Sequence, residues 1–398
     1  MKNVTGHVEN EILTITLSGH IDSVNASQIE DEINDLKNDN PDCSIVIDCE
    51  PLEYISSAGL RIILRLRKEH QELKIINVSS EVYEIFDMTG FTEMIPIEKG
   101  FRKLSIDGCE VIGRGANGTV YRIDRDTIIK VYRDSETLKE VERERELARK
   151  AFIMGIPTAI PYDVVRVGNT YGSVFELLNA DSFSSLIAKN PDELDHYIDL
   201  YIEVLKKIHS TEITDGSLPS KKKYYLEKIG SLKSLLPDGT FYKLQYLISS
   251  IPDDNHMIHG DYHTKNIMLQ DGEALLIDMD TLSLGDPIFE FSQMYDAYYG
   301  FSELNPDNDL EFLGVPFEIC DKIWKKTLRI YFNTEDEKIL NEVYKRSEVV
   351  GQITLLDWTL RHNPDKEHVE KQKELSIKHI IDDVQELESL SLKELIQK

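Results

Sequence analysis

Short apolar segments alternate with amphipathic ones along the N-terminal quarter of the chain. Residues 11–17 alternate polar and apolar side chains, which predicts a half-buried strand that ends at Gly19. Short apolar runs at 43–48 and 73–78 predict two further strands. Apolar residues at helical spacing predict intervening helices over 25–37, 56–70 and 81–88. Strands that alternate with helices of this length predict a small α/β layer with helices packed on a sheet.

The pattern changes beyond the short polar stretch 98–103, which we interpret as a linker between two domains. Apolar segments on both sides of a glycine-rich turn predict strands within 107–133. A helix over 136–154 and a strand over 170–178 are expected next. The remaining chain has a largely helical pattern apart from 256–282.

Composition narrows the class of protein. The chain has 398 residues, of which 41% are hydrophobic and 29% charged, as expected for a soluble globular protein of two or three domains. We find neither a long apolar run typical of a membrane span nor the basic and apolar pattern of a signal peptide, so a cytoplasmic location is expected. The net charge of −27 makes nucleic acid and anionic membranes poor partners. It could attract a cationic substrate, although solubility accounts for the same charge.

The cysteines do not suggest a metal site. They lack the paired spacing of zinc ligands, and we expect reduced, partly buried thiols at Cys43, Cys49, Cys109 and Cys320.

Three motifs of the N-terminal part occur in the order of a known signalling domain. They are Tyr54-Ile-Ser-Ser-Ala-Gly-Leu60 before a predicted helix, Gly19-His-Ile-Asp22 after the first predicted strand, and the segment Val78–Gly90. Together they resemble the STAS domain of the anti-anti-sigma-factor family, and we assign residues 1–103 to an α/β domain of this kind. The resemblance implies a protein partner and a phosphorylated serine, which aligns with Ser57.

Physical chemistry allows two interpretations of this serine. The first turn of a helix has free N–H groups and the positive end of the dipole, which both favour an added phosphate. Alternatively, Ser56 and Ser57 are N-cap residues with no further role.

A glycine-rich segment follows the linker. Gly113-Arg-Gly-Ala-Asn-Gly-Thr-Val120 fits the pattern GxGxxGxV, in which Gly113, Gly115 and Gly118 let backbone N–H groups approach phosphates. A dinucleotide-binding loop would lead into a helix, whereas Thr119–Ile123 continues as a predicted strand. The arrangement of strand, glycine turn and strand indicates a kinase nucleotide loop.

Lys130 lies among apolar residues on the next predicted strand, where an unpaired ammonium would be costly. We expect it to face a cleft and to pair with Glu144, because Leu147 and Ala148 give Glu144 a position next to the core. Glu146 is the alternative partner. A lysine on an edge strand that faces solvent is the other interpretation.

The segment His259-Gly-Asp-Tyr-His-Thr-Lys-Asn266 carries the strongest chemical signal. Asp261 is placed to accept a proton from a hydroxyl group, and Asn266 to ligate Mg²⁺. An apolar strand then ends in Asp278, a suitable second metal ligand. Two weaker candidates are Asp280 as an additional ligand and Asp286 as a residue that holds the loop. The two histidines are expected to brace the loop by hydrogen bonds, because no further zinc ligands are suitably spaced.

These motifs resemble the aminoglycoside phosphotransferase and choline kinase branch of the protein-kinase-like fold. The resemblance implies an α+β bilobal domain over 106–395, with the N-lobe at 106–178 and the C-lobe at 179–395. It implies that Asp261 is the catalytic base, that Asn266 and Asp278 bind Mg²⁺, and that Lys130 contacts the α- and β-phosphates. Glu176 and Leu178 would belong to the hinge that meets adenine through backbone groups. ATP is the implied donor, and GTP is not excluded.

Two functions remain open at this stage. The first is a phosphotransferase that acts on a hydroxyl group of a small molecule, such as a cationic amino sugar or amino alcohol, with STAS as a regulatory domain. The second is a signalling kinase that phosphorylates a protein serine, with Ser57 of the same chain as a candidate. No protein-kinase APE motif follows Asp280, which favours the small acceptor, whereas the STAS fusion favours signalling. A binding module with a degenerate nucleotide site is least favoured, because every catalytic part is present.

Overall fold

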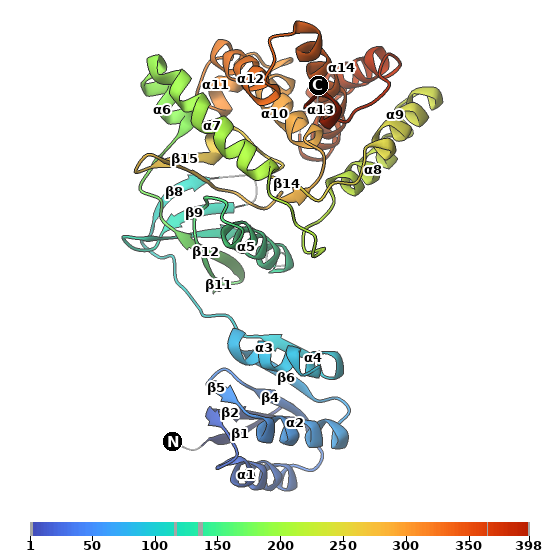
Figure 1. Ribbon diagram of the computed structural model, residues 1–398. Helices are drawn as coiled ribbons and strands as arrows, with labels where there is room; N and C mark the ends of the chain where they lie inside the picture. The colour runs from blue at the N-terminus through green and yellow to red at the C-terminus, as the bar shows by residue number, and fades with distance from the viewer. Residues whose placement is uncertain (1–2, 115–117, 134–137, 364, 397–398) are drawn as a thin grey trace. The chain divides into compact units, whose positions relative to one another are not determined.

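The computed structural model describes residues 3–114, 118–133, 138–363 and 365–396. The chain divides into two compact units, one formed by 1–105 with 164–169 and the other by 106–163 with 170–398 (Figure 1). Within the described ranges, no helix is long and apolar enough to cross a membrane.

A mixed five-stranded sheet forms the centre of the N-terminal unit. Its order is β1-β2-β4-β6-β7, in which only the β1–β2 pair is antiparallel. The bounds are β1 Val4–Glu9, β2 Ile12–Leu17, β4 Ser44–Asp48, β6 Lys74–Val78 and β7 Ile97–Lys99. A separate short pair joins β3 (Gly19–Ile21) to β5 (Leu52–Ile55). The predicted α/β layer is therefore confirmed.

The helices of this unit bury one apolar face each. Their bounds are α1 Ala26–Asp39, α2 Ser57–Glu69, α3 Ser80–Met88 and α4 Phe91–Met94. Helix α2 begins where β5 ends, and its Gly59 packs so closely that an added Cβ would lie 2.6 Å from Ile55 and 2.7 Å from Ile21. The glycine of the predicted motif therefore sets how closely α2 approaches the β3–β5 pair.

The N-lobe of the second unit is an antiparallel sheet with one helix. The strand order is β11-β12-β10-β9-β8. The bounds are β8 Glu110–Arg114, β9 Gly118–Arg122, β10 Thr127–Tyr132, β11 Pro161–Val167 and β12 Thr170–Glu176, with helix α5 over Leu138–Ile153. Strand β10 lies between β9 and β12, so Lys130 is held on a central strand. The interpretation of Lys130 as a solvent-facing edge residue is thus wrong.

The C-lobe is predominantly helical, as its sequence pattern predicts. Its longer helices are α6 Phe183–Lys189, α7 Leu194–His209, α8 Lys221–Leu232, α9 Asp238–Ser250, α10 Ile288–Tyr298, α12 Phe317–Phe332, α13 Glu337–His362 and α14 Lys366–Val384. The short elements are β13 Asp181–Ser182, η2 Pro191–Glu193, β14 Met257–Ile258, η3 Thr264–Asn266, β15 Ile267–Gln270, β16 Glu273–Leu276, β17 Ser283–Leu284, η4 Gly300–Ser302, α11 Asn308–Phe312 and α15 Lys393–Ile396. Short strands thus occupy the 256–282 segment, which the pattern set apart from the helices.

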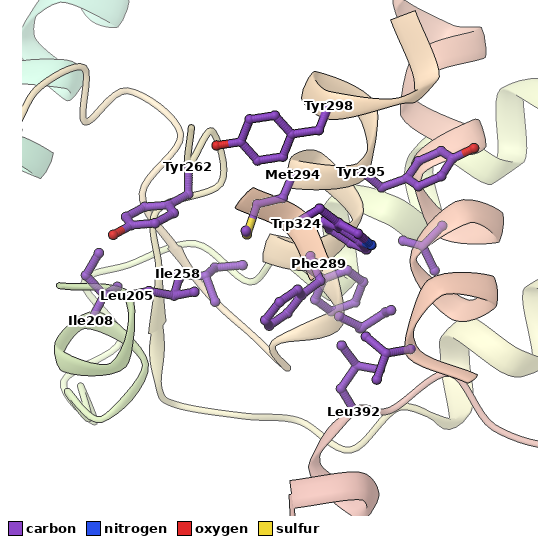
Figure 2. Close-up of a cluster of buried hydrophobic side chains, with 14 of the residues drawn as sticks. Leu205, Ile208, Ile258, Tyr262, Phe289, Met294, Tyr295, Tyr298, Trp324 and Leu392 are labelled. Carbon is purple, nitrogen blue, oxygen red and sulfur yellow. The ribbon is translucent and has the colours of Figure 1, made fainter. Parts of the chain in front are cut away.

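A large apolar core supports the segment around His259–Asn266. Figure 2 shows side chains from α7, β14, α10 and α12 meeting in one cluster. Tyr262 is 1% exposed and enters this cluster beside Tyr298, which is fully buried (Figure 2). Burial of a large aromatic residue from within the loop anchors the loop to the helical core.

Candidate active site

Asp261 and Asn266 lie in direct contact at the end of β14. The Asn266 side-chain amide donates to Asp261 Oδ2 at 3.0 Å and to the Asp261 backbone carbonyl at 3.0 Å. Both bonds use Nδ2, so the amide oxygen of Asn266 is left for another ligand. The chain turns through η3 between Asp261 and Asn266. This turn brings two residues that are five positions apart into contact.

His263 braces the Asp261 carboxylate from the other side. Its Nε2 lies 3.4 Å from Asp261 Oδ1, and its ring packs edge-on against Phe312. Desolvation by the surrounding loop raises the pKa of Asp261, but His263, His259 and Asn266 lower it more, so this pKa lies well below its ordinary value. Asp261 is therefore ionised at neutral pH and able to accept a proton.

Glu290 of α10 holds the backbone of the same loop. Its buried carboxylate accepts the N–H groups of His259 at 2.6 Å and Gly260 at 2.8 Å.

His259 also contributes its ring: Nδ1 accepts the Asp261 N–H at 3.3 Å, and Nε2 then donates to the Ile277 carbonyl at 3.2 Å. His259 therefore braces the loop by hydrogen bonds, whereas His263 contacts the Asp261 carboxylate at ion-pair distance. Glu290 was missed, although a single acid within the apolar run Pro287–Phe291 was a usable signal.

Lys130 connects the N-lobe to the second carboxylate loop. Its ammonium donates to Glu144 Oε1 at 2.9 Å and to Asp278 Oδ1 at 2.9 Å. Tyr132 donates a further hydrogen bond to Glu144. Desolvation lowers the pKa of Lys130, but the charges of Asp278 and Glu144 outweigh it and raise the pKa, so the lysine is cationic. The alternative partner, Glu146, pairs instead with Arg145 and lies on the exposed side of α5.

The end of β16 brings several oxygen ligands together. Asp278 has a positive φ of 63°, which turns its side chain out of the strand direction toward Lys130. Burial and the nearby charge of Asp278 raise the pKa of Asp280 to about 7. Asp278 lies near enough to Asp280 to shift its pKa, and the Ile277 N–H donates to the Asn266 carbonyl at 3.0 Å, so the two adjoining loops supply oxygen donors of the kind that Mg²⁺ prefers. These residues therefore fit the expected divalent cation.

The described glycines of the predicted nucleotide loop differ in how much space an added side chain would have. A Cβ on Gly118 would lie 2.3 Å from the Val131 carbonyl oxygen, whereas one on Gly113 would make only an ordinary contact, 3.6 Å from Val120. Gly118 is thus required for β9 to pair with β10. Gly115 lies outside the described residues.

The predicted hinge follows β12. The Glu176 N–H donates to Ile160 and the Leu177 N–H to Asp126, at 3.0 and 2.8 Å respectively. Within the described ranges, the Leu178 N–H makes no hydrogen bond, so it can serve a ligand such as the adenine ring.

Asp286 does not hold the loop of Asp278 and Asp280, so that expectation is wrong. Its carboxylate accepts the N–H groups of Ile288 at 2.9 Å and Leu392 at 3.1 Å, and a hydroxyl hydrogen bond from Ser391. It therefore joins the start of α10 to the C-terminal segment. The short carboxylate reaches these groups because Pro287 turns the chain into the helix directly after it.

In the N-terminal unit, the two adjacent serines have different environments. Ser56 is the N-cap of α2, and its hydroxyl accepts the Ala58 N–H at 3.2 Å. Ser57 is the first helical residue and is exposed. The capping role thus belongs to Ser56, and the Ser57 hydroxyl is available at the positive end of the helix.

Comparison with known proteins decides the family. The model of the phosphotransferase enzyme family, APH, matches residues 108–312, which is more than half of the chain. The chain belongs to this phosphotransferase family. A STAS domain model matches residues 3–104. The C-terminal part of the protein is therefore a phosphotransferase of the APH family, and the N-terminal part is a STAS domain, as the motifs indicated.

One curated protein and several solved structures are similar to parts of this chain. The protein described as "Putative anti-sigma factor antagonist BtrV" from Bordetella bronchiseptica is 36% identical over 90 residues, which cover 22% of this chain and 77% of that protein. Among solved structures, ADP-bound aminoglycoside phosphotransferase APH(2'')-Ib is 16% identical with a TM-score of 0.49, covering 76% of this chain and 98% of that one. APH(4)-Ia in complex with ADP and hygromycin B is 11% identical with a TM-score of 0.48, covering 70% and 93%.

Proposed function

We propose that this phosphotransferase transfers the γ-phosphoryl group of ATP to a hydroxyl group of a small molecule in a Mg²⁺-dependent reaction, and that the STAS domain regulates it. Two contacts between side chains of the second unit support this proposal most directly. Asn266 binds Asp261 at 3.0 Å, and Lys130 binds Asp278 at 2.9 Å. These are the parts that phosphoryl transfer requires: a base, oxygen ligands for a metal, and a cation for phosphates.

Each residue has a definite task in this proposal. Asp261 accepts the proton of the acceptor hydroxyl, whose oxygen then forms a bond to the γ-phosphorus while the bond to the β–γ bridging oxygen breaks and ADP leaves. Lys130, positioned by Glu144, neutralises the α- and β-phosphates. Asn266 and Asp278 would hold Mg²⁺, which neutralises phosphate charge during transfer. The Leu178 N–H and the Glu176 carbonyl of the hinge form hydrogen bonds with the adenine ring. The guanine ring of GTP would have to pair with the same two groups.

Asp261→Asn tests the transfer directly, because the amide keeps the shape of the side chain but cannot accept the proton. The measurement is acceptor-dependent ADP release by the full chain with ATP and Mg²⁺, using a library of hydroxyl-bearing metabolites. We expect at least one compound to stimulate the wild type and none to stimulate Asp261→Asn. Equal stimulation of both proteins would refute the assignment of the base.

A second acceptor is favoured by the exposed Ser57 hydroxyl at the start of α2. With Ser56 as the cap, Ser57 is free to take a phosphate in the STAS domain of another copy or of a relative. Incubation with labelled ATP and Mg²⁺ alone separates this candidate from the first. Label that both Ser57→Ala and Asp261→Asn abolish would favour the signalling function. No label on the wild type, together with ADP release on adding a metabolite, would exclude it.

A further inference from the structure

The first turn of α8 has an unusual charge pattern. Lys221, Lys222 and Lys223 occupy its first three positions, and the turn contains no acidic residue. Cations are unfavourable there, because the N-terminus of a helix is the positive end of its dipole. An ion pair to Asp253, at 3.2 Å, offsets only Lys222. Such a local conflict between sequence and structure is typical of functional positions.

Lys221 is the residue of this turn that is buried. It is 8% exposed, and in the part of the chain that the structure describes its ammonium makes neither a hydrogen bond nor an ion pair. Lys221 Nζ lies over the ring of Tyr224, 5.0 Å from the ring centroid. A buried ammonium without an anionic partner is costly, so a partner from outside the chain is expected.

The ammonium of Lys221 lies beside the catalytic loop. A Cβ added to Gly260, the residue before Asp261, would lie 2.9 Å from Lys221 Nζ and 2.8 Å from the Thr281 carbonyl oxygen. The charges of Glu290, Asp261 and Asp280 act on Lys221, but desolvation is the larger effect and lowers its pKa. Lys221 is therefore close to the base that we assign, without being paired to it.

The backbone holds Lys221 in this place. The preceding residue, Ser220, caps α8 by accepting the Lys223 N–H at 3.4 Å and forms a bridge with Leu284. The Leu284 N–H donates to the Pro219 carbonyl at 2.8 Å. These bonds tie the start of α8 to β17, which follows the second carboxylate loop.

A second cation is close enough to Lys221 to affect its pKa. Arg143 of α5 is exposed, and within the described residues it makes no hydrogen bond or ion pair. Its like charge contributes to the lowered pKa of Lys221. One cation, Arg143, and three acids, Glu290, Asp261 and Asp280, thus act on Lys221, and within the described residues none of the acids is paired with its ammonium.

We propose that Lys221 and the first turn of α8 bind an acidic group of the acceptor, a carboxylate or a phosphate, and so select hydroxyl compounds that are anionic. This inference rests on the proposed function, because it places the acceptor beside Asp261. Lys130 already supplies a cation for the nucleotide phosphates, whereas Lys221 lies on the Gly260 side of the base. A polycationic acceptor would instead meet an unpaired like charge there.

Matched acceptors test this selection in the full chain. The assay measures ADP release with ATP and Mg²⁺ for sets that differ in one group: glycerate, glycerol 3-phosphate and glycerol; gluconate, glucose and glucosamine. We expect stimulation by acidic members. Lys221→Met should raise the KM of the acidic acceptor at least tenfold with the KM of ATP within twofold, and Lys221→Arg should restore most of the affinity. Lys233→Met is the control, because this lysine is exposed and lies at the other end of α8, and it should behave as the wild type.

Other results of this assay would overturn the inference. Preference for glucosamine would show that the ammonium does not select an acid. A lower kcat and slower acceptor-free ATP hydrolysis in Lys221→Met, with the acceptor KM unchanged, would assign Lys221 to the γ-phosphate.

A binding measurement separates this inference from the proposed function. With AMP-PNP and Mg²⁺ saturating, the γ-phosphate position is filled, and acidic members should raise the Tm of the wild type and of Asp261→Asn but not of Lys221→Met. Acid binding without any transfer would refute the proposed function and keep the anion site. No rise in Tm with any acidic member would overturn the site itself.

Discussion

Lys130 Nζ and Asp278 Oδ1 lie 2.9 Å apart, although 148 residues separate them in the chain. The pair joins the central strand of the N-lobe to the carboxylate loop of the C-lobe. Glu144 of α5 accepts a hydrogen bond from the same ammonium. Lys130 therefore connects β10, α5 and the loop that contains Asp278. The distances that matter for phosphoryl transfer thus depend on long-range packing of the two lobes.

Glu144→Gln should weaken this arrangement selectively. Glu144 is 5% exposed, and breaking one partner of a buried ion pair typically costs about 3–5 kcal/mol. We expect kcat/KM for ATP to fall by roughly two to three orders of magnitude, because each 1.4 kcal/mol corresponds to about tenfold. Steady-state kinetics with ATP as the varied substrate measures this change.

Glu146→Gln is the matched control for Glu144→Gln on the same helix. Glu146 is exposed and pairs with Arg145 at 2.9 Å, and surface pairs contribute about 0–1 kcal/mol. Its kinetics should stay within about twofold of the wild type. Equal losses in the two variants would contradict the assignment of Glu144 as the partner of Lys130.

Glu290→Gln should weaken the hydrogen bonds that hold the backbone of the His259–Asn266 loop. The His259 and Gly260 N–H groups bond to different oxygens of Glu290, and the amide replaces one of these oxygens with an NH2 donor, so one N–H loses its acceptor at a cost of about 1–3 kcal/mol. Urea unfolding should show this loss. Glu318→Gln, an exposed acid on α12, should leave stability unchanged.

The same carboxylate has a predictable pH dependence. Burial raises the pKa of Glu290, but His209, His259 and the Gly260 N–H lower it further, so the folded pKa lies below 4.5. The stability that Glu290 contributes is present above pH 4.5 and is lost as the pH falls through the folded pKa. The wild type should therefore lose more stability than Glu290→Gln between pH 5 and lower pH. Parallel curves for the two proteins would contradict this role.

Local patterns located the His259–Asn266 segment and the partner of Lys130 more readily than the residues that support them. The spacing of Asp261 and Asn266 is set by one turn, and Glu144 follows from the periodicity of a single helix. Glu290 and Lys221 act on residues that lie 30 or more positions away, which no local pattern specifies. Strand β1 was missed because five of its six residues are exposed and show no apolar alternation. Asp286 was misassigned because its partners come from the end of the chain.

Gly118→Ala should destabilise the N-lobe, whereas Gly113→Ala should not. The added methyl group would lie 2.3 Å from the Val131 carbonyl oxygen in the first case and at an ordinary 3.6 Å from Val120 in the second. Backbone atoms of β10 cannot move without breaking the β9–β10 pairing. We expect a loss of about 1–3 kcal/mol for Gly118→Ala only, measured by urea unfolding. A comparable loss in Gly113→Ala would show that the contact does not decide the effect.

His379 should give the C-lobe a stability that declines at high pH. Its Nε2 lies 2.8 Å from Glu303 Oε1 and its Nδ1 3.3 Å from Glu348 Oε1. The hydrogen bond to Glu303 raises the pKa of His379 above 6.5, and the charges of Glu303, Glu348 and Asp383 add to this effect. The contribution is complete below pH 6.5 and is lost as the pH rises through the folded pKa. The Tm of the wild type should fall between pH 6 and 9 more than that of His379→Gln, and an equal fall would refute the role.

Ser56→Ala and Ser57→Ala should separate capping from modification in the STAS domain. Ser56 accepts the Ala58 N–H, so its loss should cost about 0.5–2 kcal/mol and speed amide exchange in the first turn of α2. Ser57 is exposed, so Ser57→Ala should leave exchange unchanged. Ser57→Asp should slow it, because a negative charge at a helix N-terminus contributes about 0.3–1 kcal/mol. Hydrogen–deuterium exchange of the full chain measures all three variants. Faster exchange in Ser57→Ala would show that Ser57 supports the helix itself, and the phosphoacceptor hypothesis would lose the free hydroxyl on which it depends.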